Sequence, residues 1–262
     1  MKKSLIYLSA LLGVMLFTAC NSGDDPVNKQ TLSLVFNSRM SGNGSNPIVF
    51  SQATGQMEIN YTDQNIKFTI PYKNLDSVQA TLTTPLLAME HYSGTVYRLR
   101  SQESQVISAL SGFIDLSTGM TWLKQSGDHQ GSTLLATTQL VYAYLTTTVT
   151  DQEGKTYSHD QSGYIFALNS KGETAMMEVT SFIPDTGGAI QASVLDYEGL
   201  KVTITPDGYH ITAPEAICKQ ATYYNVTDLD VNVTDDGMYI NGSYKMKDNT
   251  YKMTGRLFPA QN

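Results

Sequence analysis

The sequence predicts an all-β fold, arranged as an antiparallel barrel or as two tandem related β lobes, with two short helices. Three observations favour this class. Thr, Tyr, Val, Ile and Ser are abundant and only 16% of residues are charged, and β-branched and aromatic side chains suit a pleated, half-buried surface. Apolar and polar residues alternate along the chain, and turn signals that contain glycine separate the alternating runs.

The alternating runs predict strands that bury one face and expose the other. Each run places its apolar side chains on the same side of the strand, with polar residues between them. The clearest sets are Leu32, Leu34 and Phe36; Met57, Ile59 and Tyr61; Ile66, Phe68 and Ile70; Leu200, Val202 and Ile204; and Leu229, Val231 and Val233.

Glycine-containing pairs predict the turns between these strands. They are Glu153-Gly154, Lys171-Gly172, Asp207-Gly208, Asp236-Gly237 and Asn241-Gly242. The segment from Tyr224 to Phe258 is predicted to form a meander of three strands.

Two short stretches break the alternation and predict the helices. Within residues 101–110, Val106, Ile107 and Leu110 have helical spacing, and Ser101 suits an N-cap. In residues 213–220, Pro214 is the second residue, and the first turn of a helix tolerates proline.

A repeated pattern indicates an internal duplication. The segment from Val78 to Leu82 resembles that from Ile190 to Val194 at an offset of 112 residues, and the same offset carries Tyr97-Arg98-Leu99 onto Tyr209-His210-Ile211. We therefore expect one β-rich half over residues 31–125 and another over 139–262. Residues 126–138, rich in Ser, Gly and Thr, suit a loop or linker between them.

The N-terminus has the three parts of a secretory signal peptide. Lys2 and Lys3 precede an apolar run from Leu5 to Phe17, which is shorter than the ~20 apolar residues of a membrane span. Its end, Phe17-Thr18-Ala19-Cys20, resembles a bacterial lipobox. That resemblance implies cleavage of residues 1–19, lipid attachment at Cys20 and a membrane-anchored mature chain.

The residues behind Cys20 form a flexible acidic leader over residues 20–30. Asn21-Ser22-Gly23-Asp24-Asp25-Pro26 resembles the export tag of Bacteroidota surface lipoproteins. The resemblance implies a lipid-anchored protein on the outer face of the outer membrane, with the periplasmic face as the alternative.

The Tyr-rich C-terminal meander adds a family resemblance. Together with the lipobox and the leader, the segments from Tyr224 to Leu229, from Asn241 to Tyr244 and from Gly255 to Leu257 look like the calycin-like β-barrel lipoproteins of Bacteroidota. Those proteins are largely of unassigned function. The resemblance implies a barrel that holds a ligand and implies no reaction.

Charge and cysteine content narrow the classes of partner. Removal of residues 1–19 leaves 15 basic against 24 acidic residues, a net charge of −9. This balance and the lack of a basic cluster argue against nucleic acid as a partner. Cys218 is the only cysteine besides Cys20, so the sequence predicts a buried free thiol and no disulfide within the folded chain.

The sequence indicates no catalytic, cofactor or metal site. Asp228-Leu229-Asp230-Val231-Asn232 opens like a calcium loop, but Val233 stands where that loop needs glycine. The four histidines lie far apart in the sequence, and nucleophile-elbow, phosphate-loop and zinc-protease motifs are absent from it. We expect no cofactor.

Aromatic residues supply the remaining site hypothesis. Tyr142 and Tyr144 lie two apart, so that a strand places them on one face, and Trp122 is the single tryptophan. An aromatic ligand surface of Trp122, Tyr142 and Tyr144 would suit a glycan. The sequence favours an outer-membrane binding module for a small ligand, a glycan or a partner protein. A structural partner of a surface complex is the alternative, and an unrecognised hydrolase is less favoured.

Overall fold

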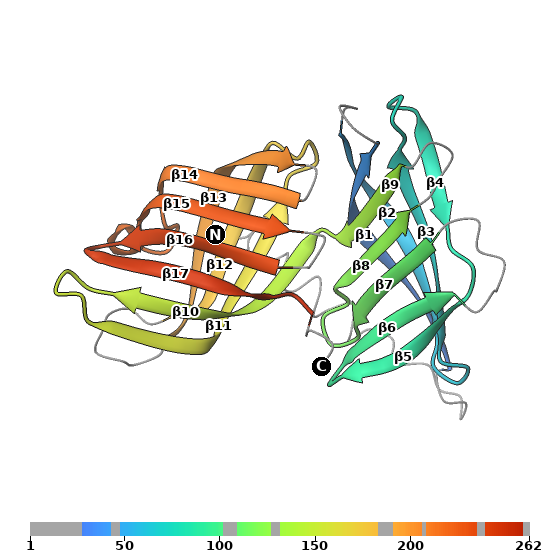
Figure 1. The fold of residues 1–262 in the computed structure, drawn as a ribbon, viewed down its shortest axis with the longest axis horizontal. Coiled ribbons are helices and arrows are strands. Elements are labelled where there is room, and N and C mark those ends of the chain that lie inside the picture. Colours follow the sequence, from blue (N-terminus) through green and yellow to red (C-terminus); the bar gives the residue numbers. More distant parts are fainter. Residues whose placement is uncertain are drawn as a thin grey trace.

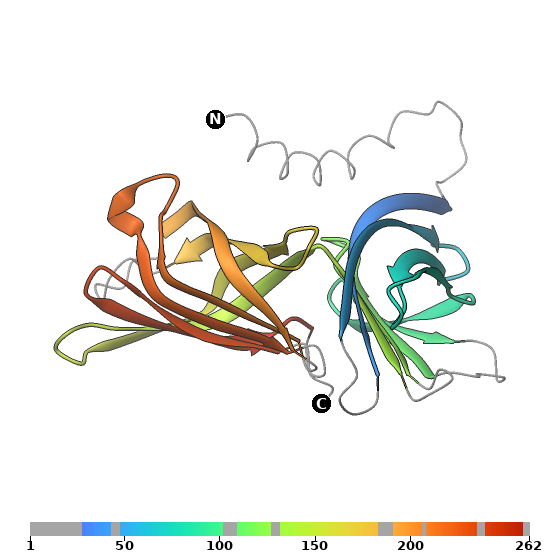
Figure 2. The same ribbon diagram turned by 90° about the horizontal axis from the view of Figure 1, so that it is seen from above.

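The computed structural model describes residues 28–42, 48–101, 109–126, 132–182, 191–205, 208–234 and 239–258. These residues form two antiparallel β lobes that lie side by side along the longest axis of the molecule (Figures 1 and 2). The all-β prediction is confirmed, in its two-lobe form. The predicted signal peptide, Cys20 and most of the predicted leader lie outside the described residues. Within the described part, no helix is long and apolar enough to cross a membrane.

The first lobe is a sheet of nine strands that closes on itself. Both β4 and β5 pair with one edge of β3, and β2 pairs with the other edge of β3. Eight strands, β1 to β3 and β5 to β9, therefore close into a ring, and β4 lies beside β3 outside this ring. The strands are β1 (Lys29–Ser41), β2 (Val49–Asn60), β3 (Asn65–Lys73), β4 (Gln79–Thr83), β5 (Leu87–Ser93), β6 (Val96–Ser101), β7 (Ala109–Asp115), β8 (Thr121–Ser126) and β9 (Thr133–Thr138).

The second lobe is a closed barrel in which each strand pairs with its neighbours in sequence and β17 returns to β10. Its strands are β10 (Leu140–Thr150), β11 (Thr156–Leu168), β12 (Thr174–Phe182), β13 (Gln191–Thr205), β14 (Gly208–Ala216), β15 (Val226–Thr234), β16 (Tyr239–Met246) and β17 (Asn249–Arg256). The last three strands form the predicted C-terminal meander.

The two lobes follow the same strand order, and the repeated sequence pattern falls on equivalent strands. Gln79 and Gln191 begin β4 and β13, and Tyr97 and Tyr209 lie in β6 and β14. The long strand β13 pairs with β12 in the second lobe. In the first lobe the two shorter strands β4 and β5 together take the equivalent place beside β3. A duplication within the chain remains our interpretation of this correspondence.

The helix predictions fail where the structure tests them. Ala213–Ala216 belong to β14, and a 3-10 helix follows at Thr222–Tyr224. The strand accommodates Pro214 because the pairing with β15 skips this residue. Ala213 pairs with Leu229 and Glu215 pairs with Thr227, so no ladder hydrogen bond is required of the proline, which has no N–H group. In the other stretch, Ser101 ends β6 and Leu110 lies in β7, while residues 102–108 lie outside the described residues.

Two further expectations need correction. The loop expected at 126–138 contains β9, which pairs with β1 and β8 and so completes the first lobe. Asn241-Gly242 lies inside β16 and makes no turn. A Cβ on Gly242 would lie 2.6 Å from the backbone oxygen of Asp230, so this glycine permits close approach of β15.

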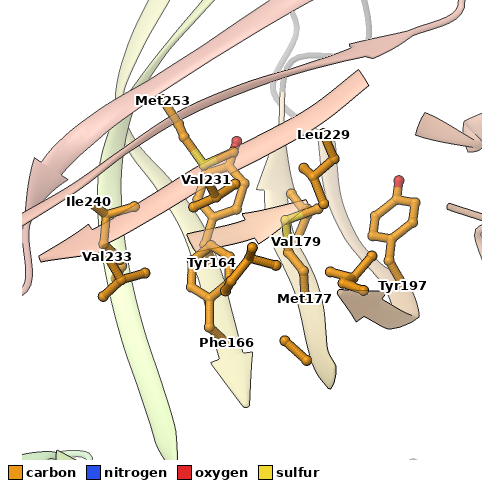
Figure 3. Close-up of a cluster of buried hydrophobic side chains, with 14 of the residues drawn as sticks. Tyr164, Phe166, Met177, Val179, Tyr197, Leu229, Val231, Val233, Ile240 and Met253 are labelled. Carbon is orange, nitrogen blue, oxygen red and sulfur yellow. The ribbon is translucent and has the colours of Figure 1, made fainter. Parts of the chain in front are cut away.

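Side chains fill the interior of the second barrel. Figure 3 shows Tyr164, Phe166, Met177 and Val231 pointing toward one another from β11, β12 and β15. The buried Tyr164 hydroxyl lies 3.1 Å from the Thr147 hydroxyl and 3.2 Å from the Tyr244 hydroxyl, so its polar atom is satisfied inside the barrel. The resemblance to calycin-like lipoproteins implied a barrel that holds a ligand, and here aromatic and aliphatic side chains occupy that interior.

Candidate functional site

One residue, Gln139, separates the last strand of the first lobe from the first strand of the second. Its side-chain amide donates to the carbonyl oxygen of Leu168 at 3.3 Å, and Gln52 of β2 donates to the same oxygen at 3.2 Å. Two side chains from the first-lobe side therefore bind the end of β11. The junction is short and hydrogen-bonded on both sides.

Apolar side chains on the outer face of the first lobe extend this contact. Trp122, Met120 and Leu135 belong to the same buried cluster as the interior of the second barrel. Phe50 of β2 packs against Gly172 in the turn between β11 and β12. Since burial of apolar surface is the main stabilising term in packing, these contacts hold the lobes together.

A pocket of about 530 Å³ opens beside this contact, with walls from both lobes. The first lobe contributes Leu32–Val35 of β1 and the turn residues Thr118 and Gly119. The outer face of the second barrel supplies Leu140 and Tyr142 of β10, Ala167 of β11, Met176 of β12 and Glu198 of β13. Its size is typical of a small-molecule site, and its lining is mainly apolar.

The predicted aromatic residues do not form one surface. Tyr142 and Tyr144 share the outer face of β10, where Tyr142 lines the pocket and Tyr144 is 71% exposed. Trp122 is only 7% exposed and packs near Phe113, with ring centroids 6.2 Å apart. Trp122 is a contact between lobes and cannot offer a face to a sugar.

Two carboxylates that the sequence did not single out lie in the same cross-strand row as Tyr142. The register of β10 to β13 places Tyr142 opposite Ile165, Ile165 opposite Glu178, and Glu178 opposite Asp196. We call these four residues the outer row. Asp196 is 4% exposed although it lies on an outer barrel face.

The electrostatics of the outer row are unusual. Burial, and then the charge of Asp196, raise the pKa of Glu178 to about 7. Burial, followed by the charges of Glu178 and Tyr144, raises the pKa of Tyr142. Asp196 Oδ2 accepts a 2.8 Å hydrogen bond from Gln220, and Glu198 forms an ion pair with Lys219.

A single sequence could not reveal the pairing of Glu178 with Asp196. Alternation places each on a wet face, because Met177 and Val179 flank one and Leu195 and Tyr197 flank the other. Their alignment depends on register, and irregularities shift the β12–β13 register on both sides of Glu178. These shifts cannot be read from residue spacing.

Other candidate chemistry stays dispersed in the described part of the chain. No group of three or more His, Cys, Asp and Glu residues there could hold a metal ion. His210 lies 3.2 Å from Asp230 in a half-exposed pair on the second barrel. Cys218 is a buried free thiol, as the sequence predicted. The arrangement offers a shaped, largely apolar pocket with polar groups beside it.

No protein-family model and no curated protein matches the chain. Among solved structures, the chain is similar to the isotype 1 transferrin binding protein B from serogroup B Neisseria meningitidis. That match has a TM-score of 0.28 and 7% identity, and it covers 88% of this chain and 77% of the other. Intact Ap-TbpB, with its N and C lobes, gives a TM-score of 0.27 and 8% identity over 88% of this chain and 78% of that one. Scores at this level carry no argument about function.

Proposed function

We propose that this protein is a lipid-anchored outer-membrane binding module that holds a small, mainly apolar ligand between its two lobes. The pocket carries this proposal, because it combines a volume of about 530 Å³ with a mainly apolar lining from both lobes. Small-molecule sites favour such concave, apolar surfaces with a few polar groups. The filled interior of the second barrel supports the space between the lobes as the binding site.

The proposed anchor is the lipid on Cys20, and the acidic leader directs the protein to the outer face of the membrane. Several acyl chains at ~0.8 kcal/mol per buried methylene hold a protein firmly. Lys29 begins β1 nine residues after Cys20, and Leu32–Val35 of that strand line the pocket. Nine residues span at most ~30 Å, so the tether keeps the pocket close to the membrane surface.

The other functions considered have weaker support. A glycan platform loses Trp122, which is buried between the lobes. A structural partner that adds a strand needs a free sheet edge, and among the described strands only the short β4 (Gln79–Thr83) lies outside the two closed rings. A hydrolase would use convergent catalytic groups, whereas the pocket lining is mainly apolar and includes a single carboxylate, that of Glu198.

Filling the pocket tests the proposal. Ala167 lines it from the outer face of β11, so Ala167→Trp should block it. Ala88 is a half-exposed outer residue of β5 outside the lining, and Ala88→Trp is the matched control. The neutral fluorophore N-phenyl-1-naphthylamine should bind the wild-type protein and the control and lose about tenfold in affinity for Ala167→Trp. Equal binding by all three proteins would contradict the proposal.

A further inference from the structure

Two buried carboxylate oxygens meet on the outer face of the second barrel. Glu178 and Asp196 stand opposite each other on β12 and β13, and both point away from the interior that Met177 and Tyr197 fill. Glu178 Oε1 and Asp196 Oδ1 are each buried and accept no hydrogen bond from another described residue, although the two carboxyl groups are close enough to share a proton. A buried carboxylate oxygen without a partner is costly, so a donor or a cation is expected there.

This carboxyl pair adjoins the pocket on three strands. Met176 lines the pocket two residues before Glu178 on the same face of β12, and Glu198 lines it two residues after Asp196 on β13. Tyr142 lines it from β10, and the charge of Glu178 contributes to the raised pKa of its phenol. Glu178 and Asp196 are not lining residues themselves, so they form an acidic end next to the apolar lining, on the same strands as Met176 and Glu198.

The surrounding groups do not neutralise the pair. From β10 the titratable neighbours are Tyr142 and Tyr144, and β11 contributes the apolar Ile165. On β13 the further charge is Glu198, which is paired with Lys219 from the segment after β14. Gln220 already donates to the other oxygen of Asp196. The local charge is negative, as is the net charge of the whole chain, −7.

We propose that the acidic end of the pocket binds the protonated amine of an amphipathic ligand, with Glu178, Asp196 and the Tyr142 hydroxyl as its contacts. An ammonium group carries three donors and one positive charge, which matches two facing carboxylate oxygens and a phenol oxygen. The apolar body of the ligand lies over Met176 and Ala167. The inference rests on the proposed function, because it assigns a chemical class to the ligand of that same pocket.

In the protein without ligand, a proton on Glu178 takes the place of the ammonium group below about pH 7. The pKa of Glu178 is raised to about 7, so at lower pH its carboxyl can donate to Asp196. An ammonium ligand must displace that proton, whereas a neutral ligand of the same shape has no such requirement. Amine affinity should therefore fall about tenfold for each pH unit below about 7.

Competition against bound N-phenyl-1-naphthylamine tests the inference. Dodecylamine and dodecanol share an apolar chain, and an alkylamine with a pKa of ~10 stays charged throughout the range used. At about pH 8 the amine should displace the fluorophore at about a tenfold lower concentration than the alcohol. Between about pH 8 and pH 5.5 this advantage should disappear, while displacement by dodecanol stays constant.

Substitutions of the two carboxylates test whether they cause the preference for the amine. Glu178→Gln keeps the shape of the side chain and should remove both the preference for the amine and its pH dependence while leaving dodecanol binding unchanged. Asp196→Asn should act in the same direction, and exposed Glu215 of β14 supplies the control Glu215→Gln, expected to behave as wild type. Equal displacement by amine and alcohol, with fluorophore binding intact, would overturn this inference and leave the proposed function standing. Failure of the wild-type protein to bind the fluorophore would overturn the proposed function itself.

Discussion

The ring of Phe258 stacks on the ring of Phe113, with centroids 5.4 Å apart and an interplanar angle of 20°. Phe258 follows the last strand of the second barrel, and Phe113 lies on β7 of the first lobe. The end of the second lobe is thus fastened to the outside of the first. This contact and the Gln139 junction join the lobes at two separate points of the chain.

Phe258→Ala should destabilise the protein by about 3 kcal/mol, because it removes a buried aromatic ring from the contact between lobes. Urea unfolding of the mature chain measures this change. Arg256→Ala, an exposed position in the same segment, should change the free energy of unfolding by less than about 0.5 kcal/mol. A similar effect of both substitutions would show that the Phe113–Phe258 contact contributes little.

Gly172 and Gly154 allow a matched test of packing between the lobes. Both adopt positive φ, +71° and +82°, so alanine costs about 1 kcal/mol of backbone strain at either position. A Cβ on Gly172 would also lie 2.8 Å from the Phe50 ring of the first lobe and 2.8 Å from Cδ1 of Ile204 in its own lobe, whereas a Cβ on Gly154 meets open space. Gly172→Ala should therefore cost about 1–3 kcal/mol more than Gly154→Ala in thermal unfolding. Equal costs would argue against tight packing of Phe50 on this turn.

Glu178 should make the stability of the protein depend on pH. Its pKa rises from 4.5 to about 7 on folding, so between these values the folded protein binds more protons than the unfolded chain. The contribution of this side chain to the free energy of unfolding is therefore greatest below pH 4.5 and is lost as the pH rises to about 7.

Glu178→Gln removes this dependence, so the variant should gain stability relative to wild type as the pH rises from about 5 to about 8. Thermal unfolding at several pH values measures the difference. Glu215→Gln on β14 is the control. A constant difference between Glu178→Gln and wild type across this range would contradict the assignment.

Cys20→Ser should release the protein from the membrane and abolish incorporation of labelled fatty acid, because it removes the proposed attachment atom. Cys218→Ala, which changes the only other cysteine, should retain the label.

Protease should remove the wild-type protein from intact cells, and Asp24→Ala with Asp25→Ala should protect it. Cleavage of the double variant to the same extent would contradict the export role of the leader.

Short-range periodicity was sufficient to predict the fold class. Leu229, Val231 and Val233 are buried in β15 as their alternation predicts, and Ile66, Phe68 and Ile70 are buried in β3. The offset of 112 residues pointed correctly to two lobes, since it maps Tyr97 of β6 onto Tyr209 of β14. These features repeat within single strands or between equivalent strands, so they can be read directly from the sequence.

The candidate site depended on relationships that no local pattern contains. The pocket needs the docking of β1 against the outer face of β10 to β12, and the carboxyl pair needs the irregular register between β12 and β13. Trp122 was misjudged because a residue on the outer face of one barrel can be buried by its neighbour. The helix predicted from Pro214 failed because the strand pairing skips that proline.

The single-residue junction at Gln139 has a consequence for how the binding site could have arisen. The pocket takes Leu32–Val35 from one lobe and Tyr142, Ala167 and Met176 from the other, so neither barrel contains it alone. In the duplication that we infer, an ancestral single barrel would have lacked the cavity, and joining two barrels with so short a connection would have created it. The proposed ligand site therefore belongs to the two lobes together and to neither lobe alone.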